Sequence, residues 1–190
     1  MTNILFVCTG NTCRSPMAEA MFTNIAQQRG LSLSVRSAGV STMDGMPTSE
    51  GALTALKKRE ITYDGSSKRL TKDAVAWATL ILTMTTGHKQ SLLQWYPEAV
   101  DRTFTLKEFV YQEEDWMKDI TELEHLYSEM QMQQALGGQL TGEQRQRLLH
   151  LESKIPSFDI ADPFGGSQVV YDACALELEE VLIKLADKLA

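Results

Sequence analysis

A short apolar run, followed by a cysteine-containing turn and a helix start, constrains the fold of this chain more than any other feature. Residues 4–7 are all apolar and predict a buried parallel strand. The turn runs from Cys8 to Ser15, and Pro16 follows it. Because serine favours the N-cap and proline the first helical position, we expect Ser15 to cap a helix. The N-terminus therefore predicts a strand, a tight turn and a helix, which begin a parallel α/β unit.

Apolar segments alternate with helical patterns along the rest of the chain. The other expected strands are at residues 31–39, 79–84 and 102–106. The expected helices are at residues 15–29, 49–56, 72–76, 86–96 and 167–189. This alternation predicts an α/β, three-layer fold, in which helices flank a four-stranded parallel sheet. Ligands of such sheets bind beyond the carboxyl ends of the strands, which is where the turn after residue 7 lies.

The turn carries the chemistry of an oxyanion site. Backbone N–H groups converge on one point in a turn of this kind, and the helix dipole adds positive potential there. The same environment favours a thiolate over a thiol, and Cys8 lies at its mouth. Arg14 supplies a planar guanidinium that can hold two oxygens of a phosphate. A thiolate, a nest of amides and a guanidinium around one tetrahedral anion indicate a cysteine-dependent phosphatase.

Three motifs carry a resemblance to a known family. Residues 8–15 contain a cysteine, five further residues, an arginine and a serine; residues 36–39 are Arg-Ser-Ala-Gly, and residues 162–167 are Asp-Pro-Phe-Gly-Gly-Ser. In this order they resemble the low-molecular-weight protein tyrosine phosphatase family. Thr12 and the third motif are similar to the bacterial protein arginine phosphatases within it. The resemblance covers nearly the whole chain except residues 112–157.

The resemblance implies catalytic roles for residues of the turn. Cys8 would attack phosphorus and form a phosphocysteine intermediate, and Arg14 would hold the phosphoryl oxygens through the transition state. The hydroxyl of Ser15 would stabilise the thiolate. Asn11 and Ser37 resemble polar residues that support the loop from behind, although ordinary turn chemistry would also explain them. The expected substrate-binding residues are Thr9, Gly10, Asn11, Thr12, Cys13, Ser15 and Phe164.

The resemblance also assigns the general acid. Asp162 would protonate the leaving atom and then act as base for the water that hydrolyses phosphocysteine. Pro163 restricts it to an extended conformation, and the two glycines after Phe164 permit a loop that returns over the pocket. Asp159 is the competing acid, but it lacks the proline context.

The residue types at the pocket mouth favour phosphoarginine over phosphotyrosine as the substrate. Thr12 is a branched hydroxyl where tyrosine phosphatases of the family usually carry an aliphatic residue. Phe164 offers one flat wall, and Gly165 omits a second aromatic wall. Asp162 could accept hydrogen bonds from a guanidinium. We therefore expect removal of phosphate from phosphoarginine in proteins, with phosphotyrosine hydrolysis as the alternative and neutral variation as the alternative explanation of Thr12.

The remaining cysteines suggest different roles. Cys13 matches a family position that can form a reversible disulfide with the nucleophile and protect it from over-oxidation; a small buried residue behind the loop is the alternative. Cys174 lies on the apolar stripe of the last expected helix, so we predict that it is part of the core. That stripe comprises Val170, Cys174, Leu178, Val181, Leu182, Leu185 and Leu189.

Composition limits the classes of partner. The 190 residues are enough for a single domain spanning the chain. A net charge of -7 argues against a general nucleic-acid binder. No apolar run approaches the ~20 residues of a membrane span, and no signal peptide is visible. Three cysteines without framework spacing indicate a reducing cytoplasm. His88, His125 and His150 lack ligand spacing, so we expect no metal and no other cofactor.

Residues 112–157 depart from the family pattern and predict an inserted helical hairpin. The first helix would carry an apolar face, and Thr141 with Gln144 would form a capping box for the second. The predicted apolar residues are Trp116, Ile120, Leu123, Tyr127, Met130, Leu148, Leu151 and Ile155. The hairpin would be either a surface elaboration packed on its own apolar seam, or a lid, a dock for protein substrates or a contact with a partner or a second copy.

Two other functions fit the motifs less well. An arsenate reductase on the same scaffold would need further reactive cysteines in a mobile segment, and none lies between Cys13 and Cys174. A phosphate-binding protein without activity would be expected to lack the nucleophile or the acid, and this chain has both.

Overall fold

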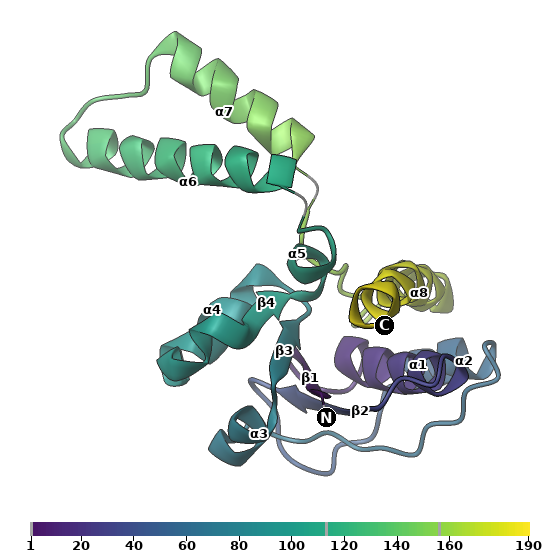
Figure 1. Cartoon of the computed structure of the whole chain (residues 1–190). Coiled ribbons are helices and arrows are strands. Elements are labelled where there is room, and N and C mark those ends of the chain that lie inside the picture. The colour runs from purple at the N-terminus through teal and green to yellow at the C-terminus, as the bar shows by residue number, and fades with distance from the viewer. Residues whose placement is uncertain (1, 113, 156) are drawn as a thin grey trace. The chain divides into compact units, whose positions relative to one another are not determined.

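Four parallel strands form one sheet in the order β2-β1-β3-β4, as the computed structural model shows (Figure 1). The structure describes residues 2–112, 114–155 and 157–190. The strands are β1 (Thr2–Cys8), β2 (Leu33–Gly39), β3 (Leu80–Thr83) and β4 (Thr103–Thr105). The crossovers place β1, the strand that ends at Cys8, between two neighbours. The fold is therefore the predicted α/β sheet, and Cys8 lies at its carboxyl edge. The turn at residues 8–15 is called the phosphate loop below.

Strand β1 is buried on both faces, which explains its unbroken apolar sequence. Ile4 and Phe6 point to one face, where the ring of Phe6 meets Phe22 edge to face at 5.9 Å between centroids. Leu5 and Val7 point to the opposite face and belong to a second cluster of buried residues. Burial of each such side chain stabilises the fold by roughly 2 kcal/mol, and the two faces together fix the position of Cys8.

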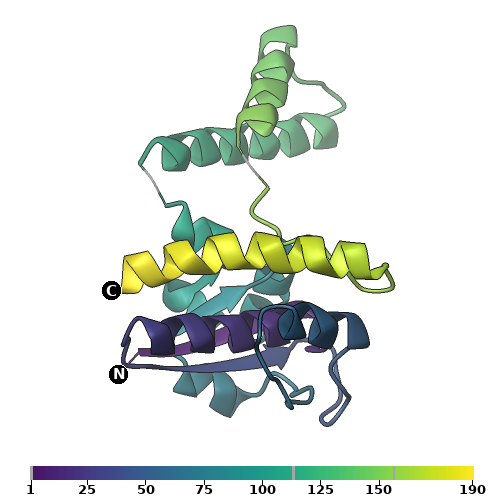
Figure 2. The same ribbon diagram turned by 90° about the vertical axis from the view of Figure 1, so that its right-hand side faces the viewer.

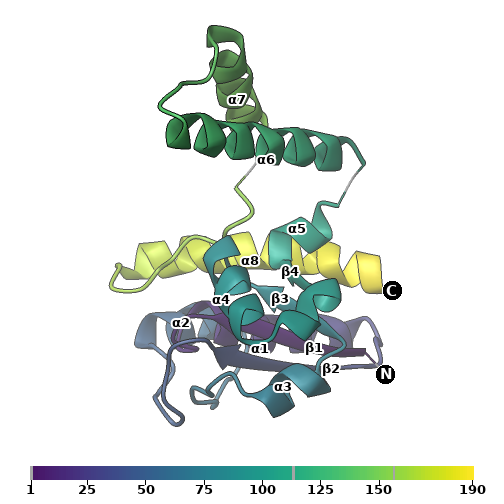
Figure 3. The ribbon, with the colours of Figure 1, turned by 90° about the vertical axis from the view of Figure 1, so that its left-hand side faces the viewer.

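Helices cover both faces of the sheet (Figures 1 and 3). On one side lie α1 (Arg14–Gln28), α2 (Glu50–Lys57) and α8 (Gln168–Leu189). On the other side lie α3 (Lys72–Trp77) and α4 (Thr86–Trp95). Figure 2 shows α1 and α8 side by side. Two shorter elements are the 3₁₀ helix η1 (Pro97–Arg102) and the helix α5 (Leu106–Val110). Helix α5 packs on α8 and was not predicted from the sequence.

The start of α1 differs from the prediction. The helix begins at Arg14, and Cys13 takes the N-cap position without a side-chain capping bond. The hydroxyl of Ser15 is instead bonded to Cys8 and Asn11, so it is not available as a cap. The prediction of Ser15 as the N-cap was wrong because a sulfur seven residues earlier competes for that hydroxyl.

The last helix largely follows its predicted stripe. Cys174, Leu178, Val181, Leu182 and Leu185 are buried. The two ends of the stripe deviate: Val170 is exposed and Leu189 is half-buried.

Gly39 ends β2 directly beside Cys8, its partner in the strand register. A Cβ at this position would lie 2.6 Å from the carbonyl oxygen of Thr9 and 2.8 Å from the methyl group of Thr42. Backbone and loop approach so closely here that only glycine fits without a shift. The phosphate loop is thereby supported along one flank by the end of β2.

Residues 111–157 form a second compact unit, separate in its contacts from residues 1–110 and 158–190. It contains α6 (Glu114–Ala135) and α7 (Gly142–Lys154). Residues 113 and 156 of the predicted 112–157 insertion lie outside the described residues, as does the side chain of Trp116. The prediction of one domain elaborated by an insertion stays a prediction.

An apolar seam joins the two hairpin helices. Leu126, Leu140, Leu148 and Leu151 are its buried members, and Leu123, Met130 and Ile155 pack against them. Tyr127, which we predicted on this face, is exposed, and its hydroxyl donates to Glu152. The capping box is confirmed: Thr141 and Gln144 exchange hydrogen bonds between side chain and backbone.

Candidate active site

A cavity of about 220 Å³ opens at the carboxyl edge of the sheet, where β1 leads into α1. It is lined by Cys8, Thr9, Gly10, Thr12, Cys13, Arg14, Asp162 and Phe164. The structure therefore brings together residues that are about 150 positions apart in the sequence. Two other predicted site residues, Asn11 and Ser15, lie buried behind the cavity wall rather than in its lining.

The sulfur of Cys8 is held by two polar groups at the foot of α1. The Ser15 hydroxyl oxygen lies 2.9 Å from it, and the Asn11 backbone N–H donates to it at 3.3 Å. Both contacts, together with the positive end of the α1 dipole, favour negative charge on sulfur. The arrangement suits a thiolate that is both nucleophile and leaving group.

Asn11 shapes the loop from inside. It is 1% exposed and adopts a left-handed backbone conformation with φ of 52°. Its amide nitrogen donates to the hydroxyls of Ser15 at 2.9 Å and Ser37 at 2.8 Å, and its oxygen accepts from the backbone N–H of Lys68 at 2.7 Å. Asparagine tolerates the left-handed region better than most residues, and these bonds hold it there. The side chain thus ties the loop to β2 and to the segment before α3.

The network continues away from the cavity through Ser37 to Glu19 and Tyr63, and the sequence analysis did not single out these last two residues. Ser37 donates to the carboxylate of Glu19 at 2.5 Å, and Tyr63 donates to the same oxygen at 3.1 Å. Burial and the neighbouring Glu19 carboxylate raise the pKa of Tyr63, so the phenol stays protonated and remains a donor. The motif at residues 36–39 contains Ser37, but no motif predicted its contact with Glu19 or the contact of Tyr63 with the same carboxylate.

Arg14 lies deep in the site, with a side chain only 6% exposed. One guanidinium nitrogen donates to the backbone oxygen of Ile160 at 3.2 Å, and another lies 3.0 Å from Asp162 Oδ2. A buried cation needs a partner, and Asp162, with a side chain 56% exposed, provides the charge from the solvent side. A phosphate that enters the cavity would compete with this carboxylate for Arg14.

Residues 159–166 carry the predicted general acid, Asp162, and are called the acid loop below; this loop folds back at residues 162–166. The backbone N–H of Phe164 donates to Asp162 Oδ1 at 3.2 Å, and that of Gly166 donates to the oxygen of Pro163 at 2.9 Å. Gly165 has φ of +74°, which favours glycine. This turn leaves the ring of Phe164 76% exposed at the cavity mouth. Asp162, the predicted general acid, lines the cavity.

The three cysteines are free thiols with different surroundings. Cys13 is buried beside the cavity; its thiol donates to the Ser49 hydroxyl at 3.3 Å and lies 3.5 Å from the Tyr171 hydroxyl. Cys174 is buried in α8 and donates to the oxygen of Ala161 at 3.4 Å. Burial raises the pKa of Cys174 to about 12, so it is an inert thiol of the core, as predicted.

His88 is a site neighbour that sequence reasoning missed. Its Nε2 lies 2.7 Å from the hydroxyl oxygen of Thr9. Burial, and secondarily the charge of Arg14, lower its pKa to about 4, so the imidazole is neutral near pH 7. One signal could have found it: His88 follows β3 closely, at the same sheet edge as Cys8.

Within residues 2–112, 114–155 and 157–190, no group of three His, Cys, Asp or Glu side chains could hold a metal ion. None of the helices in those ranges combines the length and apolar character needed to span a membrane.

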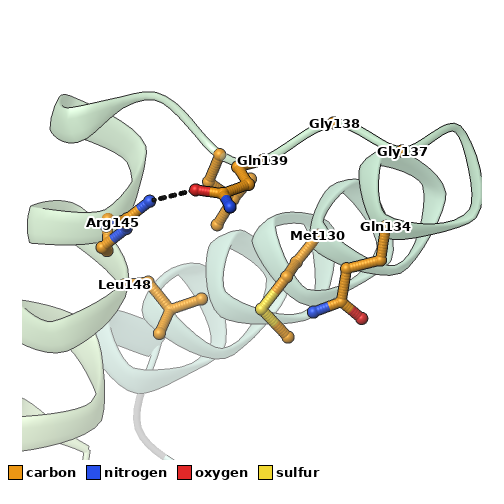
Figure 4. A pocket seen from close by; sticks show the side chains of 8 residues that line it. Met130, Gln134, Gly137, Gly138, Gln139, Arg145 and Leu148 are labelled. Atoms are coloured by element: carbon orange, nitrogen blue, oxygen red, sulfur yellow. Dashed lines mark hydrogen bonds between the residues drawn. The ribbon is translucent and has the colours of Figure 1, made fainter.

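The hairpin has a hollow of its own, of about 480 Å³ (Figure 4). Met130, Leu140 and Leu148 give it apolar walls, and Arg145 donates to Gln139 across it at 3.4 Å. Among the described residues that line it there is no cysteine, histidine or carboxylate, the groups that phosphoryl transfer at a cysteine site would need.

Two curated proteins resemble this chain over nearly its whole length. A protein-arginine-phosphatase of Geobacillus stearothermophilus is 38% identical over 186 residues, which cover 98% of this chain and 95% of that protein. A second protein-arginine-phosphatase, from Bacillus subtilis (strain 168), is 36% identical over 187 residues, which cover 98% of this chain and 96% of that protein.

Solved structures of arginine phosphatases are also similar to this chain. The arginine phosphatase of Geobacillus stearothermophilus superimposes with a TM-score of 0.72 at 37% identity, covering 100% of this chain and 93% of that one. A mutant arginine phosphatase with a phosphorylated active-site serine has a TM-score of 0.73 at 34% identity, covering 99% and 95%.

The sequence model of a family described as low molecular weight phosphotyrosine protein phosphatase matches residues 3–129, which include the phosphate loop. Enzymes of this family are cysteine-dependent protein phosphatases, as the Cys8 site requires. This chain belongs to the low molecular weight phosphotyrosine protein phosphatase family.

Proposed function

We propose that this protein removes phosphate from phosphoarginine in proteins through a phosphocysteine intermediate. The observation that carries the proposal is the Cys8 sulfur, which lies 2.9 Å from the Ser15 hydroxyl in a cavity shared with Arg14 and Asp162. The names of the two full-length relatives support phosphoarginine as the substrate. Phosphorylated proteins are the partners, and no metal or other cofactor takes part.

In the first step the Cys8 thiolate attacks phosphorus opposite the leaving nitrogen. The S–P bond forms as the P–N bond breaks, and Asp162 transfers its proton to the nitrogen that leaves as arginine. Arg14 and the N–H groups of the loop from Thr9 to Cys13 hold the three phosphoryl oxygens. Arg14 exchanges Asp162 for phosphate, which frees the carboxyl group for the leaving atom.

In the second step water attacks the phosphocysteine. The Asp162 carboxylate takes a proton from the water, the new P–O bond forms, and the S–P bond breaks. The electron pair returns to sulfur, where the Ser15 hydroxyl and the Asn11 N–H stabilise it. Inorganic phosphate leaves, and Asp162 is protonated again for the next cycle.

Substrate choice depends on the cavity mouth. Thr12 lines it with a hydroxyl and a methyl group, and Gly165, the residue after Phe164, adds no second aromatic side chain. A guanidinium is planar and polar at its edge, so a hydroxyl and the carboxylate of Asp162 suit it better than they suit a phenyl ring. Phosphotyrosine hydrolysis is the second candidate, favoured by the exposed ring of Phe164 and by the description of the family.

Comparing turnover of a phosphoarginine peptide with that of the matching phosphotyrosine peptide tests the proposal. We expect the first to have the higher kcat/KM, and Cys8→Ser to abolish both activities while the protein stays folded. Thr12→Ile should raise phosphotyrosine turnover relative to phosphoarginine, roughly tenfold for a change of about 1.4 kcal/mol. Thr12→Val keeps the shape without the hydroxyl, and Thr12→Ser keeps the hydroxyl. An unchanged ratio in all three variants contradicts the role of Thr12.

A redox role for Cys13 and a location in the cytoplasm belong to the same proposal. Cys13 would form a disulfide with Cys8 under oxidation, which requires its thiol to leave Ser49 and Tyr171. Peroxide treatment and mass spectrometry should find the Cys8–Cys13 link; its absence would end this idea. A reducing cytoplasm is the location in which such a thiolate stays active.

The hairpin at residues 112–157 would be a lid, a substrate dock or a contact with a partner or second copy, with a plain surface elaboration as the alternative. Its deletion should weaken activity on phosphoproteins or change the oligomeric state. If folding, assembly and activity on protein substrates all stay the same, the hairpin is only an elaboration.

A further inference from the structure

The first turn of α4 contacts both loops of the active site, although neither loop is near it in sequence. Its His88 ring reaches the phosphate loop, where Nε2 lies 2.7 Å from Thr9 Oγ1. Its Thr86 reaches the acid loop, where Asp159 Oδ1 accepts from the backbone N–H at 2.7 Å and from the hydroxyl at 3.0 Å. One helical turn therefore lies between the loop of the nucleophile and the loop of the acid.

His88 is built into the fold rather than placed on its surface. It is 7% exposed, and its backbone N–H donates to the hydroxyl of Thr85, the N-cap of α4. Among the described residues, no group bonds its Nδ1. A buried N–H without a partner is rarer than a buried acceptor without one, so the proton belongs on Nε2. The neutral imidazole then donates to Thr9, whose own hydroxyl proton remains free.

Thr9 transmits this contact to the loop that binds phosphate. It follows Cys8 directly, and its backbone oxygen accepts from the N–H of Ser41 at 2.9 Å. One side of Thr9 is thus fixed by the segment after β2 and the other by His88. Without the imidazole the Thr9 side chain could rotate, and the neighbouring N–H groups of the loop would lose one of the contacts that hold them in place.

Asp159 fixes the acid loop in the same way. The next residue, Ile160, donates its N–H to the oxygen of Met84 at 2.8 Å and accepts from Arg14 at 3.2 Å. Asp162 follows two residues later. The carboxylate of Asp159 is thus occupied at the N-terminus of α4 and does not line the cavity, which favours Asp162 over Asp159 as the proposed acid.

We propose that the first turn of α4 positions both catalytic loops: His88 holds the phosphate loop through Thr9, and Asp159 holds the acid loop. This proposal rests on the proposed function for the roles of the two loops. His88 and Asp159 are positioning residues, since neither lines the cavity. Displacement of a reacting group by about 1 Å can cost 100-fold in rate, so the loss of either contact should lower kcat.

The first arm is tested with His88→Ala, Thr9→Val and the double variant, on para-nitrophenyl phosphate. We expect each single variant to lower kcat about tenfold with a smaller change in KM. The double variant should lose no more than the worse single variant, because both remove one interaction. His88→Asn, which keeps a side-chain donor, should recover part of the rate. Additive losses, or variants that lower only the melting temperature, would overturn this arm.

The second arm is tested with Asp159→Ala and the milder Thr86→Ala, which keeps the backbone donor. A displaced acid matters most for a leaving group that must be protonated. Asp159→Ala should therefore lower kcat more for a phosphoarginine peptide than for para-nitrophenyl phosphate, by about tenfold in the ratio. Equal losses on the two substrates would contradict a role through the acid.

The design separates this proposal from the proposed function. If the wild type does not hydrolyse phosphoarginine, a phosphotyrosine peptide replaces the phosphoarginine peptide in the second arm. The first arm is unaffected, because it uses para-nitrophenyl phosphate. Should His88→Ala fail to fold, Thr9→Val alone still decides, because Thr9 is exposed and its loss does not open the core. A Thr9→Val protein with wild-type kcat would then end the proposal.

Discussion

The catalytic unit, residues 1–110 and 158–190, and the hairpin unit, residues 111–157, differ in the contacts that hold their interiors together. In the first, Asn11, Ser15 and Ser37 are buried and bond one another. In the second, an apolar seam of leucines forms the interior, and ion pairs such as Arg147 with Glu122, at 2.6 Å, lie near the surface.

The difference teaches where precision is needed. A buried hydrogen-bond network is stable only when every member has its partner, so it fixes a single geometry. A leucine seam tolerates exchange of one apolar side chain for another of similar volume. Substitutions in the network should therefore damage rate and stability together, whereas substitutions in the seam should damage the stability of the hairpin alone.

Asn11→Ala should give the largest effect. It removes three side-chain hydrogen bonds and places alanine at φ of 52°, so we expect a loss of about 4 kcal/mol in the free energy of unfolding and about 100-fold in kcat. Urea unfolding and steady-state kinetics measure both. Asn11→Gly is the control, since it relieves the backbone strain but not the lost bonds. A stable, active Asn11→Ala would contradict the comparison.

Leu151→Ala should break the hairpin without affecting the chemistry. Leu151 is fully buried in the seam, and such truncations cost about 3 kcal/mol. Hydrogen exchange of α6 and α7 should accelerate, while kcat on para-nitrophenyl phosphate stays within twofold. Leu151→Met, close in volume, is the matched control. A large fall in kcat would show that the hairpin supports the catalytic unit after all.

The buried His88 predicts a pH effect that belongs to the catalytic unit. Its folded-state pKa of about 4 lies below the ordinary 6.5, so the unfolded chain takes up a proton first as pH falls. The stability it contributes is complete above pH 6.5 and is lost toward pH 4. Between pH 7 and pH 5 the loss should reach about 2 kcal/mol. Urea unfolding of the wild type and of His88→Asn at both pH values measures this loss. If the free energy of unfolding changes equally with pH in the two proteins, the prediction is refuted.

Thr141→Ala should give the smallest effect. It removes the capping box of α7 and should cost about 1 kcal/mol, confined to that helix. Hydrogen exchange in the first turn of α7 reports it, and Thr141→Ser, which keeps the hydroxyl, should resemble the wild type. Faster exchange throughout both helices would show that the hairpin unfolds as one cooperative unit.

How far the sequence could predict these features depends on the range of the interactions. The strand before Cys8 and the capping box at Thr141 were predictable because a few neighbouring residues determine them. The cap at Ser15 was wrong, and His88 was missed, because Cys8 and Thr9 decide those positions from elsewhere in the chain. The order of the strands in the sheet brings partners such as His88 and Thr9 together, and the hydrophobic periodicity of the sequence does not predict which residues will meet in this way.

The Gly39 contact has a consequence for how this pocket can change over time. A side chain on that flank would press on the carbonyl oxygen of Thr9 and displace the nucleophile's loop. The position of Gly39 is therefore closed to larger residues, and new substrate preferences can arise at side chains that line the cavity, such as Thr12 and Phe164. An enzyme built in this way can exchange the side chain it dephosphorylates while its reaction stays the same.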